Sequence, residues 1–232
     1  MKITMITGPT AGIGKSLAYQ LAQRGENLLL IARREERLKS ISEDIQNKFN
    51  VKVLYFVADL TTQEAPNSIY QYCKEHTLDV STLVLNAGYQ INTRLHEASI
   101  EDEEACLRVL GLSVIMQTKL HLTDFVKRGG GKIMIVSSIA AFAPTSKEFA
   151  VLYGPVKTFM NRFVEGINGA YNKDNIFATS VCPGFTTTEF HEMSGTQERM
   201  DKVPSFMKMT ADDVAKEGIA GMDKNKEIVI TG

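Results

Sequence analysis

The sequence has few cysteines, no excess of charge of one sign and no long apolar run. Its three cysteines, Cys73, Cys106 and Cys182, lie far apart without CxxC spacing, which argues against a disulfide framework and a zinc site. The four histidines show no ligand spacing either, so no metal site is expected. Lys and Arg total 26 against 27 for Asp and Glu, and this balance disfavours a nucleic-acid partner.

No stretch reaches the roughly 18 consecutive apolar residues of a membrane span, and the N-terminus is too polar for a signal peptide. With so few cysteines, the chain is expected in the reducing cytoplasm, away from membranes. Its 232 residues are 44% hydrophobic and 23% charged, a composition that supports one sizeable core. No repeat, low-complexity tract or polar linker divides them, so we expect a single domain over 1–232.

Apolar runs alternate with helical patterns from the first residue. This order is typical of βα units, because parallel strands need crossover helices between them. It predicts an α/β fold: a doubly wound, three-layer Rossmann-type sandwich with a mostly parallel sheet of about seven strands, ordered 3-2-1-4-5-6-7. The expected strands cover 3–6, 28–31, 51–57, 82–85, 132–136, 176–181 and 227–230.

Two other segments have distinct patterns. Ser99, followed three residues later by Asp102, resembles a capping box and predicts a long helix over 99–127 that Gly129 ends. Residues 183–209 have no clean period but contain four methionines, Met193 among them, and we expect a mobile substrate lid there.

The first strand runs directly into the glycine-rich stretch TGPTAGIGKS, from Thr7 to Ser16. Small residues at a strand-to-helix junction let backbone N–H groups approach a phosphate at the positive end of the helix. The stretch therefore predicts nucleotide binding. Its end matches a P-loop, but Pro9 stands where a P-loop has glycine, so a kinase or NTPase is an alternative interpretation.

The same glycines also spell TGxxxGxG, and here the chain resembles the short-chain dehydrogenase/reductase family. Further motifs of that family follow in order: Asp59 after the third strand, the triplet NAG, serine at the end of the fifth strand, YxxxK and PGxxxT. The resemblance implies Ser138, Tyr153 and Lys157 as catalytic residues. It implies a nicotinamide dinucleotide bound by Gly8, Thr10, Gly12, Ile13, Gly14, Arg33, Arg34, Asp59, Leu60, Asn86, Ala87, Gly88, Tyr153, Lys157, Pro183, Gly184, Thr186 and Thr188.

The spacing within YxxxK suggests how such a site works. Tyr153 and Lys157 are one helical turn apart, so the ammonium is expected to lower the pKa of the phenol and make it a proton donor or acceptor. Ser138 would stabilise the charge that develops as hydride reaches the carbonyl carbon. A second YxxxK, at Tyr70 and Lys74, has no serine-bearing strand before it, and we interpret it as a solvated helix face. The resemblance implies that Lys157 holds the nicotinamide ribose and that Thr188 meets the carboxamide.

The end of the second strand bears on cofactor choice. An acidic residue there would hold the ribose hydroxyls of NAD, but this chain has Ala32, Arg33 and Arg34. Guanidinium groups suit a 2′-phosphate, and Lys15 is expected to add positive charge, so NADP(H) is preferred over NAD(H). In the alternative interpretation the arginines belong to an exposed RREER face neutralised by its glutamates.

Two positions depart from the family pattern. Leu110 stands where the long helix usually carries an Asn, and Pro155 interrupts YxxxK, which requires the helix to start shortly before Tyr153. These departures keep open a second function, a nucleotide-binding regulator with little turnover. The expected partner is otherwise a small carbonyl or alcohol substrate, and the resemblance implies a homodimer or homotetramer formed through helix 99–127 and the helix after Tyr153.

Overall fold

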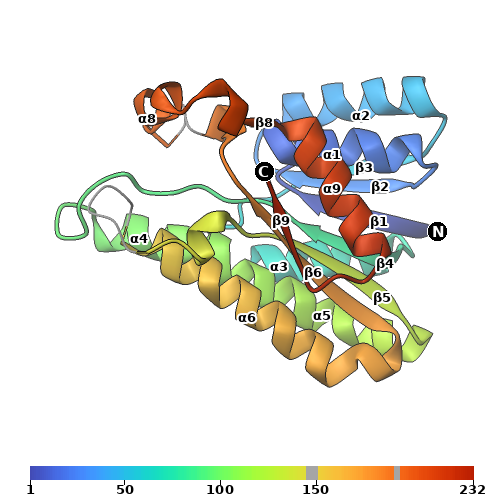
Figure 1. The fold of residues 1–232 in the computed structure, drawn as a ribbon. Coiled ribbons are helices and arrows are strands. Elements are labelled where there is room, and N and C mark those ends of the chain that lie inside the picture. The colour runs from blue at the N-terminus through green and yellow to red at the C-terminus, as the bar shows by residue number, and fades with distance from the viewer. Residues whose placement is uncertain (145–150, 191–193) are drawn as a thin grey trace.

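The computed structural model describes residues 1–144, 151–190 and 194–232. Within these ranges, seven parallel strands form one sheet in the order β3-β2-β1-β4-β5-β6-β9 (Figure 1). This order is the predicted one, which confirms the doubly wound α/β fold. The strands are β1 (Lys2–Thr7), β2 (Leu28–Ala32), β3 (Val53–Val57), β4 (Asp79–Leu85), β5 (Gly131–Val136), β6 (Ile176–Pro183) and β9 (Ile228–Thr231).

Helices cover both faces of the sheet (Figure 1). α3, α4, α5 and α6 pack on one face, and α1, α2 and α9 pack on the other. Among the described residues, no helix combines the length and the apolar surface that crossing a bilayer requires. The helices are α1 (Gly12–Gln23), α2 (Glu35–Phe49), α3 (Ala65–Glu75), α4 (Ile100–Leu107), α5 (Ser113–Arg128), α6 (Tyr153–Tyr171) and α9 (Ala211–Asp223).

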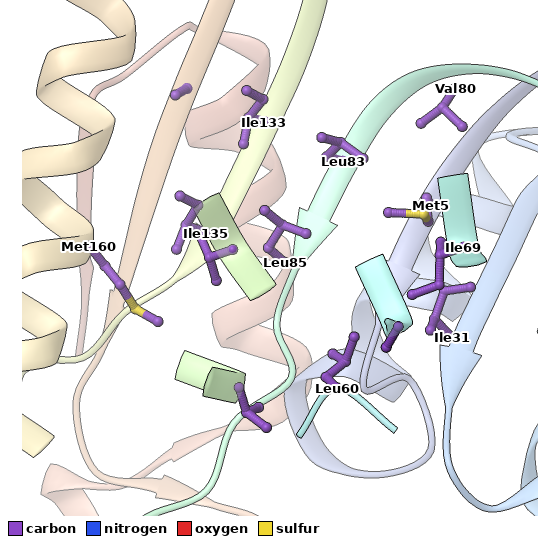
Figure 2. Close-up of a cluster of buried hydrophobic side chains, with 14 of the residues drawn as sticks. Met5, Ile31, Leu60, Ile69, Val80, Leu83, Leu85, Ile133, Ile135 and Met160 are labelled. Atoms are coloured by element: carbon purple, nitrogen blue, oxygen red, sulfur yellow. The ribbon is translucent and has the colours of Figure 1, made fainter. Parts of the chain in front are cut away.

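Alternate residues of the strands face opposite helical layers. In β2, Leu28 and Leu30 belong to the core beneath α1, α2 and α9, whereas Leu29 and Ile31 belong to the other core. All four side chains are fully buried, which explains why the strand is a continuous apolar run in the sequence. Figure 2 shows part of the core beneath α3, α4, α5 and α6, to which the neighbouring strands contribute Leu83, Leu85, Ile133 and Ile135.

The helix expected over 99–127 is present, but it is not a uniform α-helix. The Ser99 side chain accepts a backbone hydrogen bond at its start, and Gly129 ends it with a φ of 76°, both as expected. Between α4 and α5, however, lies the π-helical turn η1 (Arg108–Leu112). A π turn accommodates an extra residue and shifts the side chains that follow it. Leu110, which departs from the family pattern by standing in place of an Asn, lies within this turn.

The described residues of the segment 183–209 form only short elements. Its strands β7 and β8 pair in parallel, and the small helix α8 lies between them in the sequence. Met193 lies outside the described residues, and the mobility of the segment stays a prediction. The elements are β7 (Thr186–Thr187), α8 (Gln197–Lys202), the 3-10 turn η4 (Ser205–Met207) and β8 (Met209–Thr210).

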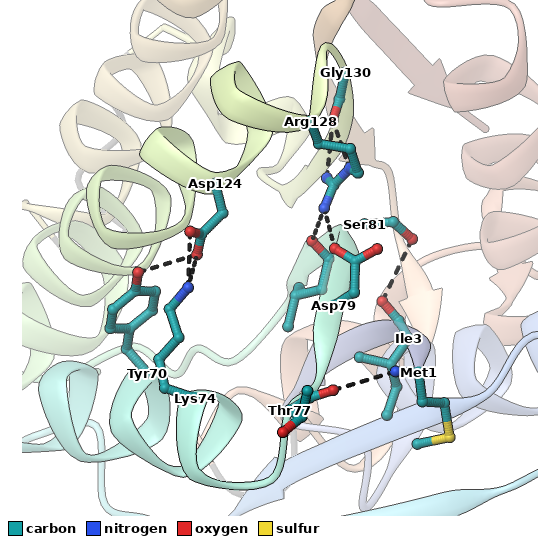
Figure 3. Close-up of polar contacts among 11 residues, drawn as sticks. Met1, Ile3, Tyr70, Lys74, Thr77, Asp79, Ser81, Asp124, Arg128 and Gly130 are labelled. Carbon is teal, nitrogen blue, oxygen red and sulfur yellow. Dashed lines mark hydrogen bonds and ion pairs between the residues drawn. The ribbon is translucent and has the colours of Figure 1, made fainter.

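The second YxxxK motif is partly solvated, as expected, since the Lys74 side chain is 46% exposed, but it also joins two helices, which the sequence did not indicate. Asp124 of α5 accepts hydrogen bonds from the Tyr70 hydroxyl at 3.0 Å and from the Lys74 ammonium at 2.7 Å (Figure 3). The Tyr70 ring also meets the buried His121 edge-on. The pair therefore connects α3 to α5 within the helical layer on one face of the sheet, and it does not line the cleft described below.

Candidate functional site

A cleft of about 740 Å³ opens at the carboxyl ends of the strands. The cleft lies where the strand order changes direction. On one side of β1 the sheet continues with β2 and β3, and on the other side it continues with β4, β5 and β6. Doubly wound sheets bind their ligands at such a point. Every catalytic and cofactor-binding residue expected from the sequence lines this cleft, with the exception of Lys15.

Three glycines shape the turn between β1 and α1. Gly8 and Gly12 have φ angles of 67° and 50°, in the left-handed region that favours glycine. A Cβ on Gly14 would collide with the Gly8 carbonyl oxygen and the Asn86 side chain. The turn therefore needs glycine at all three positions. The helix that follows has no side-chain cap at Ala11, so its first backbone N–H groups are left for a ligand.

Lys15, the lysine of the incomplete P-loop, does not line the cleft. Its ammonium lies 5.8 Å from the centre of the Tyr19 ring instead. The P-loop interpretation thus lacks its phosphate-binding lysine, and the expected contribution of Lys15 to the 2′-phosphate site is not supported.

Hydrogen bonds join the glycine turn to the end of β4. The Asn86 side-chain amide donates to the carbonyls of Thr7 and Gly8, at 3.1 and 3.0 Å. In return, the Thr7 hydroxyl accepts from the backbone N–H groups of Asn86 and Ala87, at 3.0 and 3.1 Å. Both hydrogens of the side-chain NH2 group are used in this way, so Asn86 supports the turn and has its Oδ1 acceptor left for a ligand.

Two arginines follow β2 at the mouth of the cleft. The Arg34 guanidinium donates to the Thr10 hydroxyl at 2.9 Å, and Arg33 lies 4.0 Å from the Asp59 carboxylate. In the described structure, neither arginine forms an ion pair with the glutamates that follow it. Asp59 also accepts from the backbone and hydroxyl of Thr61, which fixes its carboxylate at the end of β3. The arginines therefore present positive charge to the cleft.

Ser138, Tyr153 and Lys157 lie together on the opposite wall. The Tyr153 hydroxyl is hydrogen-bonded with Ser138, whose oxygen also accepts from the Ala140 amide at 3.1 Å. Lys157 is only 4% exposed, and its ammonium donates to the Val136 carbonyl at 2.9 Å. The same ammonium lies 5.4 Å from the centre of the Tyr153 ring.

The proline in YxxxK is accommodated as expected. Helix α6 begins at Tyr153, so Pro155 falls in the first turn, where its missing N–H breaks no helical hydrogen bond. Tyr153 and Lys157 therefore project from one face, one turn apart.

Burial shifts the pKa values of this pair in opposite directions. It raises the pKa of Tyr153 to about 12, although the hydrogen bond with Ser138 acts the other way. It lowers the pKa of Lys157 to about 8. The expectation that Lys157 lowers the pKa of Tyr153 is wrong for this structure, because the ammonium binds a carbonyl and lies over the ring instead of beside the hydroxyl.

The expected Pro-Gly pair ends β6 at the far side of the cleft. The Gly184 amide donates to the carbonyl of Thr231 at 2.9 Å, and the Thr186 hydroxyl donates to the Gly184 carbonyl at 3.0 Å. The chain then returns across the glycine turn, where Thr188 Cβ lies 3.0 Å from the place that a Cβ on Gly12 would take. A larger residue at position 12 would therefore displace this segment.

Some residues of the cleft have no motif of their own, and the sequence analysis missed them. One is Phe190, whose ring lies 6.1 Å from that of Tyr153. Only its place inside 183–209 points to it, since substrate-facing side chains follow no local pattern. The others on this segment are Phe185, Glu189, Ser194, Thr196 and Met200.

Comparison with known proteins agrees with this geometry. A family profile described as short chain dehydrogenase matches residues 2–199. The very-long-chain 3-oxoacyl-CoA reductase of Rattus norvegicus is 29% identical over 221 residues, covering 93% of this chain and 66% of that protein. The 3-oxoacyl-acyl-carrier-protein reductase FabG of Aquifex aeolicus is 28% identical over 188 residues, covering 81% of this chain and 75% of that protein.

One solved structure is similar over nearly the whole length of this chain. It is a short-chain dehydrogenase from Sphingobium yanoikuyae in complex with NADPH, with a TM-score of 0.91 and 25% identity over 99% of this chain and 87% of that one. The chain spans just under two thirds of the rat reductase but most of this structure. Because the family profile covers most of its length, the chain belongs to the short-chain dehydrogenase/reductase family.

Proposed function

We propose that this protein transfers hydride between NADP(H) and a carbonyl or secondary-alcohol substrate, with Tyr153 as general acid and base. The observation that carries the proposal is the position of Ser138, Tyr153 and Lys157, which face the glycine turn across one cleft. The printed names of the rat and Aquifex relatives, both 3-oxoacyl reductases, support the reaction class. NADPH in the Sphingobium structure supports the cofactor.

The residues of the cleft fit a dinucleotide phosphate. The glycine turn is too crowded for side chains, and α1 leaves its first backbone N–H groups without a cap, so a diphosphate suits this position. Arg33 and Arg34 would hold the 2′-phosphate, and Asp59 with Leu60 would border the adenine. Lys157 and Thr188 would hold the nicotinamide half, between Asn86, Ala87, Gly88, Pro183, Gly184 and Thr186. When bound, this cofactor supplies or accepts the hydride.

Residues of the chain itself, and not the cofactor, would transfer the proton. Because burial raises the pKa of Tyr153 to about 12, the phenol holds its proton at neutral pH and donates it to the substrate oxygen. The Ser138 hydroxyl donates to the same oxygen and afterwards stabilises the tyrosinate. With a pKa of about 8, Lys157 is mainly protonated at pH 7, and in this form it donates hydrogen bonds that hold the nicotinamide half of the cofactor beside Tyr153.

Leu110 changes how Tyr153 recovers its proton. Its side chain is 1% exposed and lies against Gly88, where the family resemblance places an Asn of the proton relay. An apolar side chain cannot pass a proton, so in this protein we expect solvent in the cleft to reprotonate Tyr153.

The proposal also covers location and assembly. The three free cysteines are all buried, which suits the reducing cytoplasm. Phe159, 40% exposed, stacks with Phe163 at 6.1 Å on α6 and forms an apolar face that suits a contact in a homodimer or homotetramer.

Replacing Tyr153 by Phe tests the proposed function. The ring stays and the transferable proton is lost, so ketone reduction by NADPH should slow by about 10²- to 10⁴-fold with little change in NADPH affinity. Tyr70→Phe is the matched control and should keep full turnover. Equal rates for wild type and Tyr153→Phe would refute the mechanism. If neither transfers hydride while both bind NADPH, the protein is the regulator of the alternative interpretation.

Cofactor preference is tested at the two arginines. Charge-assisted hydrogen bonds contribute about 1.5–3 kcal/mol each, so Arg33→Asp combined with Arg34→Ala should weaken NADPH binding by about 10²- to 10⁴-fold and leave NADH binding no weaker. Arg24→Ala, which removes an arginine paired with Asp223 outside the cleft, is the control. Titration of NADPH and NADH fluorescence gives both affinities, and an unchanged ratio would contradict the assignment.

The pKa of Lys157 predicts a pH dependence. Above about pH 8 the ammonium loses its proton, so kcat/KM for ketone reduction should be flat below pH 8 and fall above it. Lys74→Arg should leave this profile unchanged, and a profile that is flat to pH 10 would exclude the role of the ammonium.

The free energy of unfolding should change with pH in the opposite direction. In the unfolded chain Lys157 stays protonated up to about pH 10.5, whereas in the folded protein it loses its proton at about pH 8. The contribution of this lysine to the free energy of unfolding should therefore rise between pH 8 and pH 10.5.

A further inference from the structure

Residues 188–190 cross the cleft at its glycine turn, and we call them the strap. Thr188 lies against that turn, since its Cβ is 3.0 Å from the place that a Cβ on Gly12 would take. Two residues on, the Phe190 ring lies 6.1 Å from that of Tyr153. All three residues of the strap line the cleft. The part of a dinucleotide that reaches from the glycine turn to Tyr153 would therefore lie against the strap.

One ion pair ties the strap to the helix that follows the arginines of the cleft. The Arg37 guanidinium on α2 donates to the Glu189 carboxylate at 3.0 Å, although the two residues are 152 positions apart. Among the described residues, no other ion pair involves the segment 183–209. Arg37 has a firm base, because Leu38 beside it on α2 is fully buried. The pair therefore joins a short loop to an element that the core holds in place.

A carboxylate is an unexpected group in a cleft that suits a dinucleotide phosphate. Glu189 lines this cleft, and an unpaired negative charge there would repel the phosphates of the ligand. The Arg37 guanidinium, 3.0 Å away, offsets that charge. The carboxylate thus has a use only through its pairing, and the pairing fixes the strap.

We infer that Arg37 and Glu189 form a latch, which holds the strap closed over the bound cofactor and opens to release it. The inference rests on the proposed function, because the occupant of the cleft is the nicotinamide dinucleotide proposed there. Both side chains are nearly half exposed, at 47 and 46%, so the latch is weak and opens readily. Arg37 and Glu189 are therefore positioning residues, which set how long the cofactor stays without touching the reacting atoms.

The rate of cofactor dissociation measures the latch directly. Protein loaded with NADPH is mixed with excess NADP⁺ in a stopped-flow instrument, and the change in NADPH fluorescence gives the dissociation rate. Glu189→Gln and Arg37→Gln should each raise this rate by about 2- to 5-fold, the range expected for an exposed ion pair. The double variant should release NADPH no faster than either single variant, because both substitutions remove the same contact.

The two variants separate a latch from a simple effect of charge. Glu189→Gln removes a negative charge from the site, whereas Arg37→Gln removes a positive one, so electrostatic attraction of the phosphates would change in opposite directions. A latch instead predicts faster dissociation in both variants. Exchanging the charges, with Arg37→Glu and Glu189→Arg in one chain, should restore slow dissociation.

The ion pair between Arg24 and Asp223 provides the matched control. It is also 3.0 Å long, its side chains are 42 and 41% exposed, and it joins the ends of α1 and α9 outside the cleft. Arg24→Gln should therefore leave the dissociation rate of NADPH unchanged. Thermal melting of each variant shows that it is folded.

The outcomes are distinct from those that test the proposed function. Opposite effects of the two single variants, additive effects in the double variant, or unchanged dissociation would overturn the latch. Ketone reduction by the wild type is measured in parallel. If the dissociation rates change as expected but no ketone is reduced, hydride transfer is refuted and the latch stands. If ketones are reduced but the rates do not change, the latch is wrong and the proposed function stands.

Discussion

The cleft depends on the hydrogen bonds between the ends of β1 and β4. Asn86 donates both hydrogens of its side-chain NH2 group to the carbonyls of Thr7 and Gly8, and the Thr7 hydroxyl accepts hydrogen bonds from two backbone N–H groups at the end of the neighbouring strand. Asn86 reaches the turn only because Gly14 has no Cβ. The phosphate end of the cleft is thus set by backbone groups and short side chains that cannot move independently, and the arginines add charge to a site that already has its shape.

The sequence predicts this framework well, for a physical reason. Strands of a parallel sheet are buried on both faces, so each is a continuous apolar run such as Leu28–Ile31, and strand ends are then easy to locate. Residues that follow those ends must meet at one edge of the sheet. Motifs as distant in sequence as the glycine turn, Asn86 and Tyr153 therefore converge on one cleft, as expected.

Features that depend on tertiary neighbours could not be predicted in the same way. The Tyr70 and Lys74 pair finds its partner at Asp124, some 50 residues away, and nothing local indicates that contact. Burial lowers the pKa of Lys157, and its ammonium binds the Val136 carbonyl instead of lying beside the Tyr153 hydroxyl, so it does not lower the pKa of Tyr153. The π-helical turn and the residues of the segment 183–209 likewise follow no periodic pattern. Fold and motif positions were predictable, whereas protonation and substrate contacts were not.

The central claim is that the cleft moves hydride, and isotope transfer tests it most directly. NADPH carrying deuterium at the reactive nicotinamide carbon would be mixed with ethyl 3-oxohexanoate in a single turnover, and the alcohol analysed by mass spectrometry. Our account predicts that deuterium from one of the two labelled faces appears on the former carbonyl carbon of the wild-type product. Bound NADPH that keeps its deuterium in the presence of bound ketone would contradict it.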